Sequence, residues 1–326
     1  MRFEFLPRIL LITALLPITS LVHAQHAQHL TKNDIDRFMV DLSNWGRWGK
    51  ADQKGTVNLI TPAKRQAAAK LVTEGISISL SRNTDTEKAI DNDTPFGHKM
   101  MIAVGGEFNM DEYTTAFHGF ATTHFDSLSH VFYRGKMYNG FPQSNVTERG
   151  AGELAVTAFR DGFFTRGVLI DIPQLKGVPY LEPSTAIYPE DLDAWERATG
   201  VHIQPGDAVF VRTGRWARRA QKGPWNASEH SAGLYASCAK WLKEKNVALL
   251  GGDGSHDVLP SGVDGVAWPV HQILLVAVGM PLFDNCDLEA LSQAAAARKR
   301  WTFLFTAAPL AVTGGTGSPL NPTATF

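Results

Sequence analysis

Four apolar segments, separated by stretches of helical character, constrain the fold of this chain most strongly. Three of them are almost continuously apolar, as expected of strands that are buried on both faces of a sheet. The four segments span residues 167–172, 208–213, 247–251 and 301–305. A fifth segment, residues 76–80, alternates polar and apolar side chains and is therefore predicted to be a half-buried strand.

Helices are predicted between these strands. Thr61 can cap the first helix, and Pro62 suits the first helical position. The predicted helices span residues 61–72, 189–199, 231–245, 270–278 and 288–300. Strands that alternate with helices indicate an α/β architecture. Residues 25–326 show no repeat, low-complexity tract or flexible linker, so we expect a single domain.

The first 24 residues have the pattern of a secretory signal peptide. Arg2 and Arg8 accompany an apolar run, residues 9–16, that ends at Pro17, and Ala24 occupies the last position before the expected cleavage site. An uncleaved membrane anchor is the alternative, although the run is short for a transmembrane helix. We therefore expect residues 1–24 to be removed, and the mature chain to be exported to the periplasm without a membrane attachment.

The composition excludes several classes of protein. The 326 residues carry 31 Lys and Arg against 32 Asp and Glu, a formal net charge of −1, so no basic excess is available for nucleic acid or anionic lipid. Hydrophobic residues make up 44%, which is typical of a folded globular chain rather than a disordered one. The two cysteines, Cys238 and Cys286, are too few for a disulfide framework or a cysteine zinc site.

The densest group of potential metal ligands lies between His118 and His130. In an extended segment His124 and Asp126 point to the same side, because side chains alternate along a strand. Imidazole and carboxylate together suit Zn²⁺ or Mn²⁺, and ligands this close in sequence chelate with little loss of entropy. The alternative is a set of histidines that are exposed or hydrogen-bonded within the protein and bind no metal.

Other segments are weaker candidates for chemistry. Asp253 and Asp257 lie in a glycine-rich stretch after a predicted strand, but the spacing does not match an EF-hand. His271 begins an apolar helix and is either a ligand or a core histidine. No G-x-S-x-G motif is present, and the glycine-rich stretch 314–318 lacks the lysine of a phosphate-binding loop.

At these residues the chain resembles the cyclase-like metal-dependent hydrolases, the family that includes bacterial kynurenine formamidase, isatin hydrolase and trans-dienelactone hydrolase. The family signature is H-x-G-T-H-x-D-x-P-x-H. Its second half is matched by Thr123, His124, Asp126 and His130. The resemblance continues through residues 206–207, 212–214, 253, 257, 271, 274–275 and 314–319, and it covers most of the chain after about residue 45.

The chain departs from the signature at two positions. Phe120 stands where the first histidine is expected, with His118 two residues further back, and Leu128 replaces the proline. The resemblance implies that His271 takes the place of a later metal-binding histidine and that Asp284 takes the place of a glutamate. One metal ion is therefore a safer expectation than two.

The resemblance also implies a fold and an activity. We expect a swivelling β/β/α-type fold with a mixed, barrel-like β core flanked by helices, and a homodimer or higher homo-oligomer. His124, Asp126 and His271, with His118 and Asp284 as weaker candidates, would hold Zn²⁺ or Mn²⁺, and His130 would be the catalytic acid–base group. The metal would lower the pKa of a water toward about 7 for attack on a carbonyl carbon.

The leading hypothesis is a hydrolase that cleaves the C–N or C–O bond of a lactam, lactone or arylformamide. Trp45 and Trp48 are candidates for lining a pocket that takes an aromatic or cyclic small molecule, although they are equally expected in the core. One alternative is an exported protein that binds metal or ligand without turnover, and another is a polyketide-type cyclase. The residues do not distinguish zinc from manganese.

Overall fold

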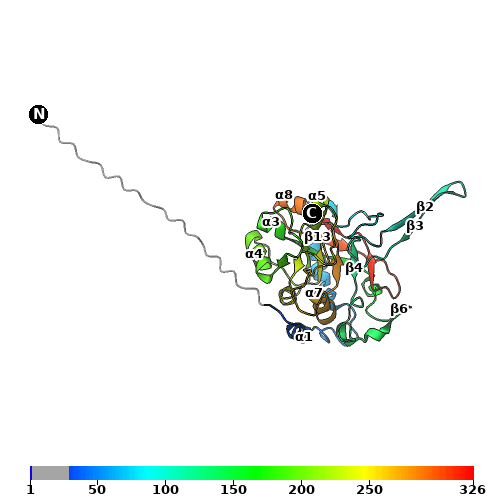
Figure 1. Cartoon of the computed structure of the whole chain (residues 1–326), viewed down its shortest axis with the longest axis horizontal. Helices are drawn as coiled ribbons and strands as arrows, with labels where there is room; N and C mark the ends of the chain where they lie inside the picture. Colours follow the sequence, from blue (N-terminus) through cyan, green and yellow to red (C-terminus); the bar gives the residue numbers. More distant parts are fainter. Residues whose placement is uncertain (2–28) are drawn as a thin grey trace.

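The computed structural model describes Met1 and residues 29–326, so the predicted signal peptide lies outside the described residues apart from Met1. Nine strands form the main sheet of this part of the chain (Figure 1). Their order across the sheet is β1 (Ser77–Ser79), β15 (Thr323–Thr325), β13 (Thr302–Ala307), β7 (Phe163–Asp171), β9 (Ala208–Arg212), β11 (Leu249–Gly252), β12 (Leu282–Asp284), β4 (His124–Asp126) and β14 (Gly317–Pro319).

The sheet is mixed. The central strands β7, β9, β11 and β12 run parallel, whereas β13, β15 and β1 on one side and β4 and β14 on the other pair antiparallel with their neighbours. The sheet curls into an open half-barrel. The predicted α/β class, with a mixed, barrel-like β core flanked by helices, is confirmed.

The helices surround this sheet, and α2, α4 and α8 contact its central strand β7. Their bounds are α1 (Lys32–Asp41), α2 (Pro62–Ala69), α3 (Ile172–Lys176), α4 (Pro189–Thr199), α5 (Arg215–Lys222), α6 (Cys238–Glu244), α7 (Pro269–His271), which continues as a π-helix (Gln272–Val278), and α8 (Glu289–Arg298). Among the described residues no helix combines the length and apolar character needed to cross a membrane.

Several predicted elements agree closely with the structure. The helix predicted over residues 189–199 is α4 with the same bounds. Thr61 caps α2, because its side-chain oxygen accepts a hydrogen bond from the backbone N–H of Lys64 at 3.2 Å. The predicted helix 270–278 is present, but it begins one residue earlier and is a π-helix over most of its length.

The helix predicted over residues 231–245 is wrong in its first half. Gly233 and Leu234 form the short strand β10 (Gly233–Leu234), which pairs with β8 (Ala186–Ile187), and α6 begins only at Cys238. A side chain at position 233 would meet the backbone oxygen of His256 at 2.4 Å, so glycine permits a close approach of two chain segments. Long-range packing overrides the local helical pattern here.

Two small antiparallel pairs complete the structure. The strands β5 (Val146–Thr147) and β6 (Gly150–Ala151) form a short hairpin. The strands β2 (Gly97–Val104) and β3 (Phe108–Thr114) form a long hairpin that projects from the body of the molecule (Figure 1). This hairpin was not predicted, because its side chains face solvent on both sides and show no polar–apolar alternation.

A cluster of phenylalanines lies beneath the strands that carry the candidate ligands. Phe283 of β12 is fully buried, and its ring centroid lies 5.2 Å from Phe125 and 5.4 Å from Phe163. Phe305 and Phe210 extend the cluster across the sheet, at 5.5 Å and 6.5 Å from Phe283. Burial of large aromatic rings contributes strongly to stability.

We predict that Phe283→Ala lowers the free energy of unfolding by about 3–5 kcal/mol, because it leaves a cavity among packed rings. Urea denaturation of the purified protein measures this loss. The matched control is Phe132→Ala, whose side chain is 50% exposed and should change stability by less than about 0.5 kcal/mol. Equal effects of the two substitutions would contradict the central place given to the phenylalanine cluster.

Candidate metal centre

The strand β4 places His124 and Asp126 on one face of the sheet and Phe125 on the other. Phe125 enters the phenylalanine cluster, so the two polar side chains must point the opposite way, into a cavity. Asp284 of β12 is the register partner of His124 and shares its face. Ligand atoms of His124, Asp126 and Asp284 all lie within 4.8 Å of one another, and all three residues are buried.

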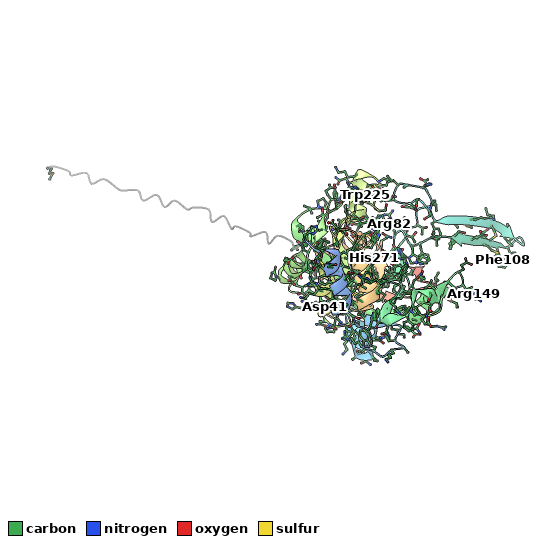
Figure 2. All side chains as sticks on the ribbon, turned by 60° about the horizontal axis from the view of Figure 1, so that its bottom comes forward. Asp41, Arg82, Phe108, Arg149, Trp225 and His271 are labelled. Atoms are coloured by element: carbon green, nitrogen blue, oxygen red, sulfur yellow. The ribbon has the colours of Figure 1, made fainter. Side chains whose placement is uncertain are left out.

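Four histidines surround the Asp126 carboxylate. His118 Nδ1 lies 2.9 Å and His124 Nε2 3.5 Å from Oδ1. His130 Nε2 lies 3.8 Å and His271 Nε2 3.9 Å from Oδ2. The structure thus brings together all the histidines that the sequence singled out, and Figure 2 shows His271 within the body of the molecule.

His271 and His256 approach the second carboxylate, Asp284. His271 Nε2 lies 3.5 Å from Oδ2 of Asp284, and His256 Nε2 lies 3.0 Å from Oδ1. His256 follows β11 with a positive φ of 59°, which turns its ring toward the site. The sequence offered His256 only as a substitute for His130 and did not place it beside Asp284, because nothing local indicates which way the backbone of a glycine-rich stretch turns.

Contacts behind the histidines orient them for metal binding. His124 Nδ1 donates to the Thr122 carbonyl at 2.8 Å, and His271 Nδ1 donates to Asp257 Oδ2 at 2.6 Å. In each ring this directs Nε2 toward a carboxylate of the site. Burial lowers the pKa of His271, but Asp257 and Asp284 raise it more, to well above its usual value, so a metal ion at this nitrogen would displace a proton. A histidine that donates one ring N–H to a carbonyl or carboxylate is the usual arrangement of a metal ligand.

Two oxygens and one nitrogen at the centre have no hydrogen bond within the described residues. They are Oδ1 of Asp126, Oδ1 of Asp284 and Nε2 of His256, all buried. His118 and His256 lie close to these oxygens but are not aligned to donate to them. Buried polar atoms without partners are costly, and a divalent cation would satisfy anionic oxygens and imidazole nitrogens together. The donor set therefore fits a divalent metal ion.

The charges of the centre support the same conclusion. Burial raises the pKa of Asp126, but His130 and His124 lower it more, and the net shift is downward. Burial likewise raises the pKa of Asp284, whereas His256 and His271 hold it well below the usual range. Both carboxylates are thus ionised at neutral pH and carry the negative charge that a cation needs.

His130 differs from the other histidines in its surroundings. Burial lowers its pKa to about 4, so the ring is neutral at pH 7 and can accept a proton. The ring stacks on His118 with centroids 3.9 Å apart, at the edge of the cavity. Ligand atoms of His118, Asp126 and His130 also lie within 4.8 Å of one another, so the geometry allows His130 to act as a ligand or as a base.

The centre opens into a cavity of about 320 Å³. Phe120 and Trp268 supply aromatic walls, with ring centroids 6.1 Å apart. The lining residues are His118, Gly119, Phe120, His124, Asp126, His130, Val131, Ser255, Trp268, His271, Gln272 and Asp284. Trp268 was not singled out from the sequence, although its position three residues before His271 places it near that ligand in any helix.

The two tryptophans expected in the pocket lie elsewhere. Trp45 Nε1 donates to the backbone oxygen of Val276 at 2.7 Å, and its ring lines a separate groove beside α1. Trp48 packs against the guanidinium of Arg47, 4.6 Å from the ring centroid. The aromatic walls of the cavity come from Phe120 and Trp268 instead.

Asn285 and Arg215 hold the segment that leads into β4. Asn285 Nδ2 donates to the carbonyl oxygens of Gly119 at 2.6 Å and Thr122 at 3.2 Å. Arg215 donates to Asn285 Oδ1 at 2.6 Å and also to the carbonyl of Phe120. The carbonyl oxygen of Thr122 accepts hydrogen bonds from both Asn285 Nδ2 and His124 Nδ1. Asn285 therefore fixes the oxygen that orients the His124 ring.

Comparison with known proteins is consistent with this arrangement. Residues 65–256 match the sequence model of a protein family described as "Putative cyclase". The crystal structure of a novel cyclase has 30% sequence identity and a TM-score of 0.78, covering 87% of this chain and 99% of that chain. No curated protein sequence matches the chain.

Isatin hydrolases share the fold at lower sequence identity. Isatin hydrolase A from Ralstonia solanacearum is 21% identical, with a TM-score of 0.56 over 81% of this chain and 97% of that chain. Isatin hydrolase A from Labrenzia aggregata, bound to benzyl benzoate, is 20% identical, with the same TM-score over 79% of this chain and 94% of that chain.

We predict that Asn285→Ala lowers metal affinity by about tenfold, because contacts behind a ligand typically contribute 10–100-fold. Titration against a competing chelator measures the affinity, and thermal melting of the same sample shows whether the variant is folded. Asn226→Ala, which removes an exposed hydrogen bond to Ser228, is the matched control and should leave metal affinity unchanged. A folded Asn285→Ala variant with parental affinity would contradict the prediction.

Proposed function

This chain belongs to the cyclase family, and we propose that it is a metal-dependent hydrolase that cleaves an amide or ester bond, C–N or C–O, with an activated water. One observation carries the proposal: a buried, ionised Asp126 lies among four histidines at the floor of a cavity, with one oxygen lacking a hydrogen bond within the described residues. A buried carboxylate that lacks a hydrogen bond and lies in a cavity large enough for a small ligand is typical of a catalytic metal site. It is not typical of a group that serves only the stability of the fold.

We assign the metal to His124, Asp126 and His271. Asp284 forms a group with His124 and Asp126 whose ligand atoms lie within 4.8 Å of one another, and His118 forms a second such group with Asp126 and His130. When bound, a divalent cation supplies Lewis-acid polarisation of a carbonyl group and makes a nearby water more acidic. A mixed nitrogen and oxygen donor set suits Zn²⁺ and Mn²⁺. Metal analysis of the purified protein distinguishes the two.

His130 is the proposed acid–base group. Its neutral imidazole can take a proton from the attacking water at Nε2 and return it to the leaving nitrogen or oxygen, so that the product leaves as an amine or alcohol. Its partial exposure at the cavity edge allows contact with a substrate, in contrast to the buried His124 and His271. A positioned group of this kind typically contributes about 10²–10⁴-fold to the rate.

The cavity favours a small, flat substrate. Its volume of about 320 Å³ lies near the lower limit of ligand pockets, and Phe120 and Trp268 offer apolar ring surfaces. Because isatin hydrolases share the fold, cyclic amides are the first substrates to test, followed by lactones and arylformamides. We also propose that the protein is exported after removal of residues 1–24, which N-terminal sequencing of the secreted chain tests.

We predict that the purified protein binds a divalent metal and hydrolyses at least one substrate in a panel of lactams, lactones, aryl formamides and esters. Treatment with a chelator should abolish activity, and Zn²⁺ or Mn²⁺ should restore it. Elemental analysis measures metal per chain, and product formation measures turnover. Bound metal without hydrolysis of any carbonyl substrate would favour a protein that binds metal or ligand without turnover.

We predict different failures for His124→Ala and His130→Ala. The first removes a metal ligand, so metal content and activity should fall together, with partial recovery in excess metal. The second should retain metal and lose about 10²-fold or more in kcat. Because the neutral form of His130 is the active one, activity of the parent falls as pH drops through its pKa, and the variant should lose this acidic limb.

The matched control for both variants is His202→Ala, which removes an exposed histidine outside the cavity and should change neither metal content nor activity. Loss of metal from His130→Ala would show that His130 is a ligand. The proton acceptor would then have to be another group of the site, with His256 or Asp257 the first to test.

A further inference from the structure

Two polar atoms in the wall of the cavity have no role in the metal centre. Ser255 Oγ and Gln272 Oε1 are buried and have no hydrogen bond within the described residues, and both residues line the cavity of about 320 Å³. The other such atoms of this wall are Oδ1 of Asp126 and Oδ1 of Asp284, which a metal ion would satisfy. Because an unpartnered buried polar atom costs free energy, Ser255 and Gln272 point to a partner that enters the cavity.

The backbone around Ser255 is fixed, whereas its hydroxyl group is not. Ser255 follows β11 and is only 5% exposed. Its carbonyl oxygen accepts a hydrogen bond from the backbone N–H of Asp257 at 2.6 Å, and the carbonyl oxygen of Gly254 accepts one from the backbone N–H of Asn285 at 3.1 Å. A serine hydroxyl can turn about its C–O bond, so Ser255 offers a donor in a fixed place.

Gln272 is joined to the same loop through the helix that carries His271. Its backbone N–H donates to the carbonyl oxygen of Trp268 at 3.1 Å. The Asp257 carboxylate accepts hydrogen bonds from the backbone N–H of His271 at 3.2 Å and from its ring Nδ1 at 2.6 Å. The positions of Ser255 and Gln272 are therefore set before a substrate arrives, which lowers the entropic cost of binding.

The chemistry of the two groups favours a substrate over the metal as their partner. Zinc sites in proteins use thiolate, imidazole and carboxylate ligands, and His124, Asp126 and His271 already provide imidazole and carboxylate. An amide oxygen only accepts hydrogen bonds, and a hydroxyl group can donate one. A matching substrate must therefore offer an N–H or O–H to Gln272 Oε1 and an acceptor oxygen to Ser255 Oγ.

A cyclic imide has this pattern of donor and acceptor. Its ring N–H lies between two carbonyl groups, so one carbonyl carbon can be attacked while the N–H and the second carbonyl oxygen are bound. A lactone or a simple ester has acceptors only, and it would leave Gln272 Oε1 buried without a donor. Sites built to bind an N–H strongly reject analogues that lack it. The rings of Phe120 and Trp268 offer apolar walls for a flat molecule.

We propose that Gln272 and Ser255 determine the substrate specificity of this site, with Gln272 Oε1 accepting the ring N–H and Ser255 Oγ donating to the second carbonyl oxygen of a cyclic imide. The assignment rests on the proposed hydrolase function and extends it. In the reaction the oxygen of water adds to one carbonyl carbon and the ring C–N bond breaks. The nitrogen takes a proton, so the product carries one carboxylic acid and one primary amide.

The test compares phthalimide with N-methylphthalimide, which lacks the N–H, and with isoindolin-1-one, which lacks the second carbonyl. The ratio of kcat/KM between variant and parent removes the intrinsic reactivity of each probe. Gln272→Leu should lower kcat/KM for phthalimide by at least about tenfold, the effect of one lost hydrogen bond, and should not lower it for N-methylphthalimide. Ser255→Ala should show the same contrast between phthalimide and isoindolin-1-one.

Binding is measured apart from turnover. Calorimetric titration gives the dissociation constants of the same probes on the His130→Ala background, in which turnover is slow. Gln272→Leu and Ser255→Ala should weaken phthalimide binding in the same pattern. Binding with this pattern but without hydrolysis by the parent would support the two recognition roles and contradict the hydrolase function instead.

The matched controls are Ser237→Ala and Gln293→Leu, because both residues lie outside the cavity and should change no measured quantity. Since Ser255 Oγ and Gln272 Oε1 have no hydrogen bond within the described residues, their removal should not lower the melting temperature or the metal content. A fall in either quantity would indicate a structural or metal-binding role and overturn the proposal. A parent that does not bind phthalimide, or an equal loss with all three probes, would also overturn it.

Discussion

The buried carboxylate of Asp126 is the constraint on which the rest of the site depends. An ionised carboxylate removed from water costs several kcal/mol unless positive charge or hydrogen bonds compensate. Four histidines from two parts of the chain, residues 118–130 and α7, lie around it, yet Oδ1 still lacks a hydrogen bond within the described residues. The protein thus keeps a negative charge in a buried position, an arrangement that metal binding explains better than stability does.

The strand β4 makes this arrangement possible, because one of its faces packs in the core and the other lines the cavity. The alternation of side chains along the strand sends Phe125 into the phenylalanine cluster and sends His124 and Asp126 into the cavity. A shift of the register by one residue would turn the two ligands into the phenylalanine cluster and Phe125 into the cavity, at a large cost in both places. The packing that stabilises the fold therefore also determines which way the ligands point.

The sequence predicted the features that local patterns encode. Apolar segments identified β7, β9, β11 and β13, and the spacing of His124, Asp126 and His130 identified the centre. The short strands β4 and β12 have three residues each, which is too few to show the alternation of polar and apolar side chains that identifies a strand in a sequence. The place of His256, and the separation of Trp45 from the cavity, depend on long-range contacts and on a positive φ that no local pattern reveals.

The departure from the family signature at Phe120 has a physical explanation in the segment before β4. A histidine at position 118 lies six residues before His124, too far along a regular strand to share a ligand. The segment 119–122 is not a strand, and Asn285 and Arg215 turn its carbonyl oxygens inward by hydrogen bonds. This turn shortens the path, so His118 Nδ1 reaches 2.9 Å from Asp126, and it leaves the Phe120 ring free to form a wall of the cavity.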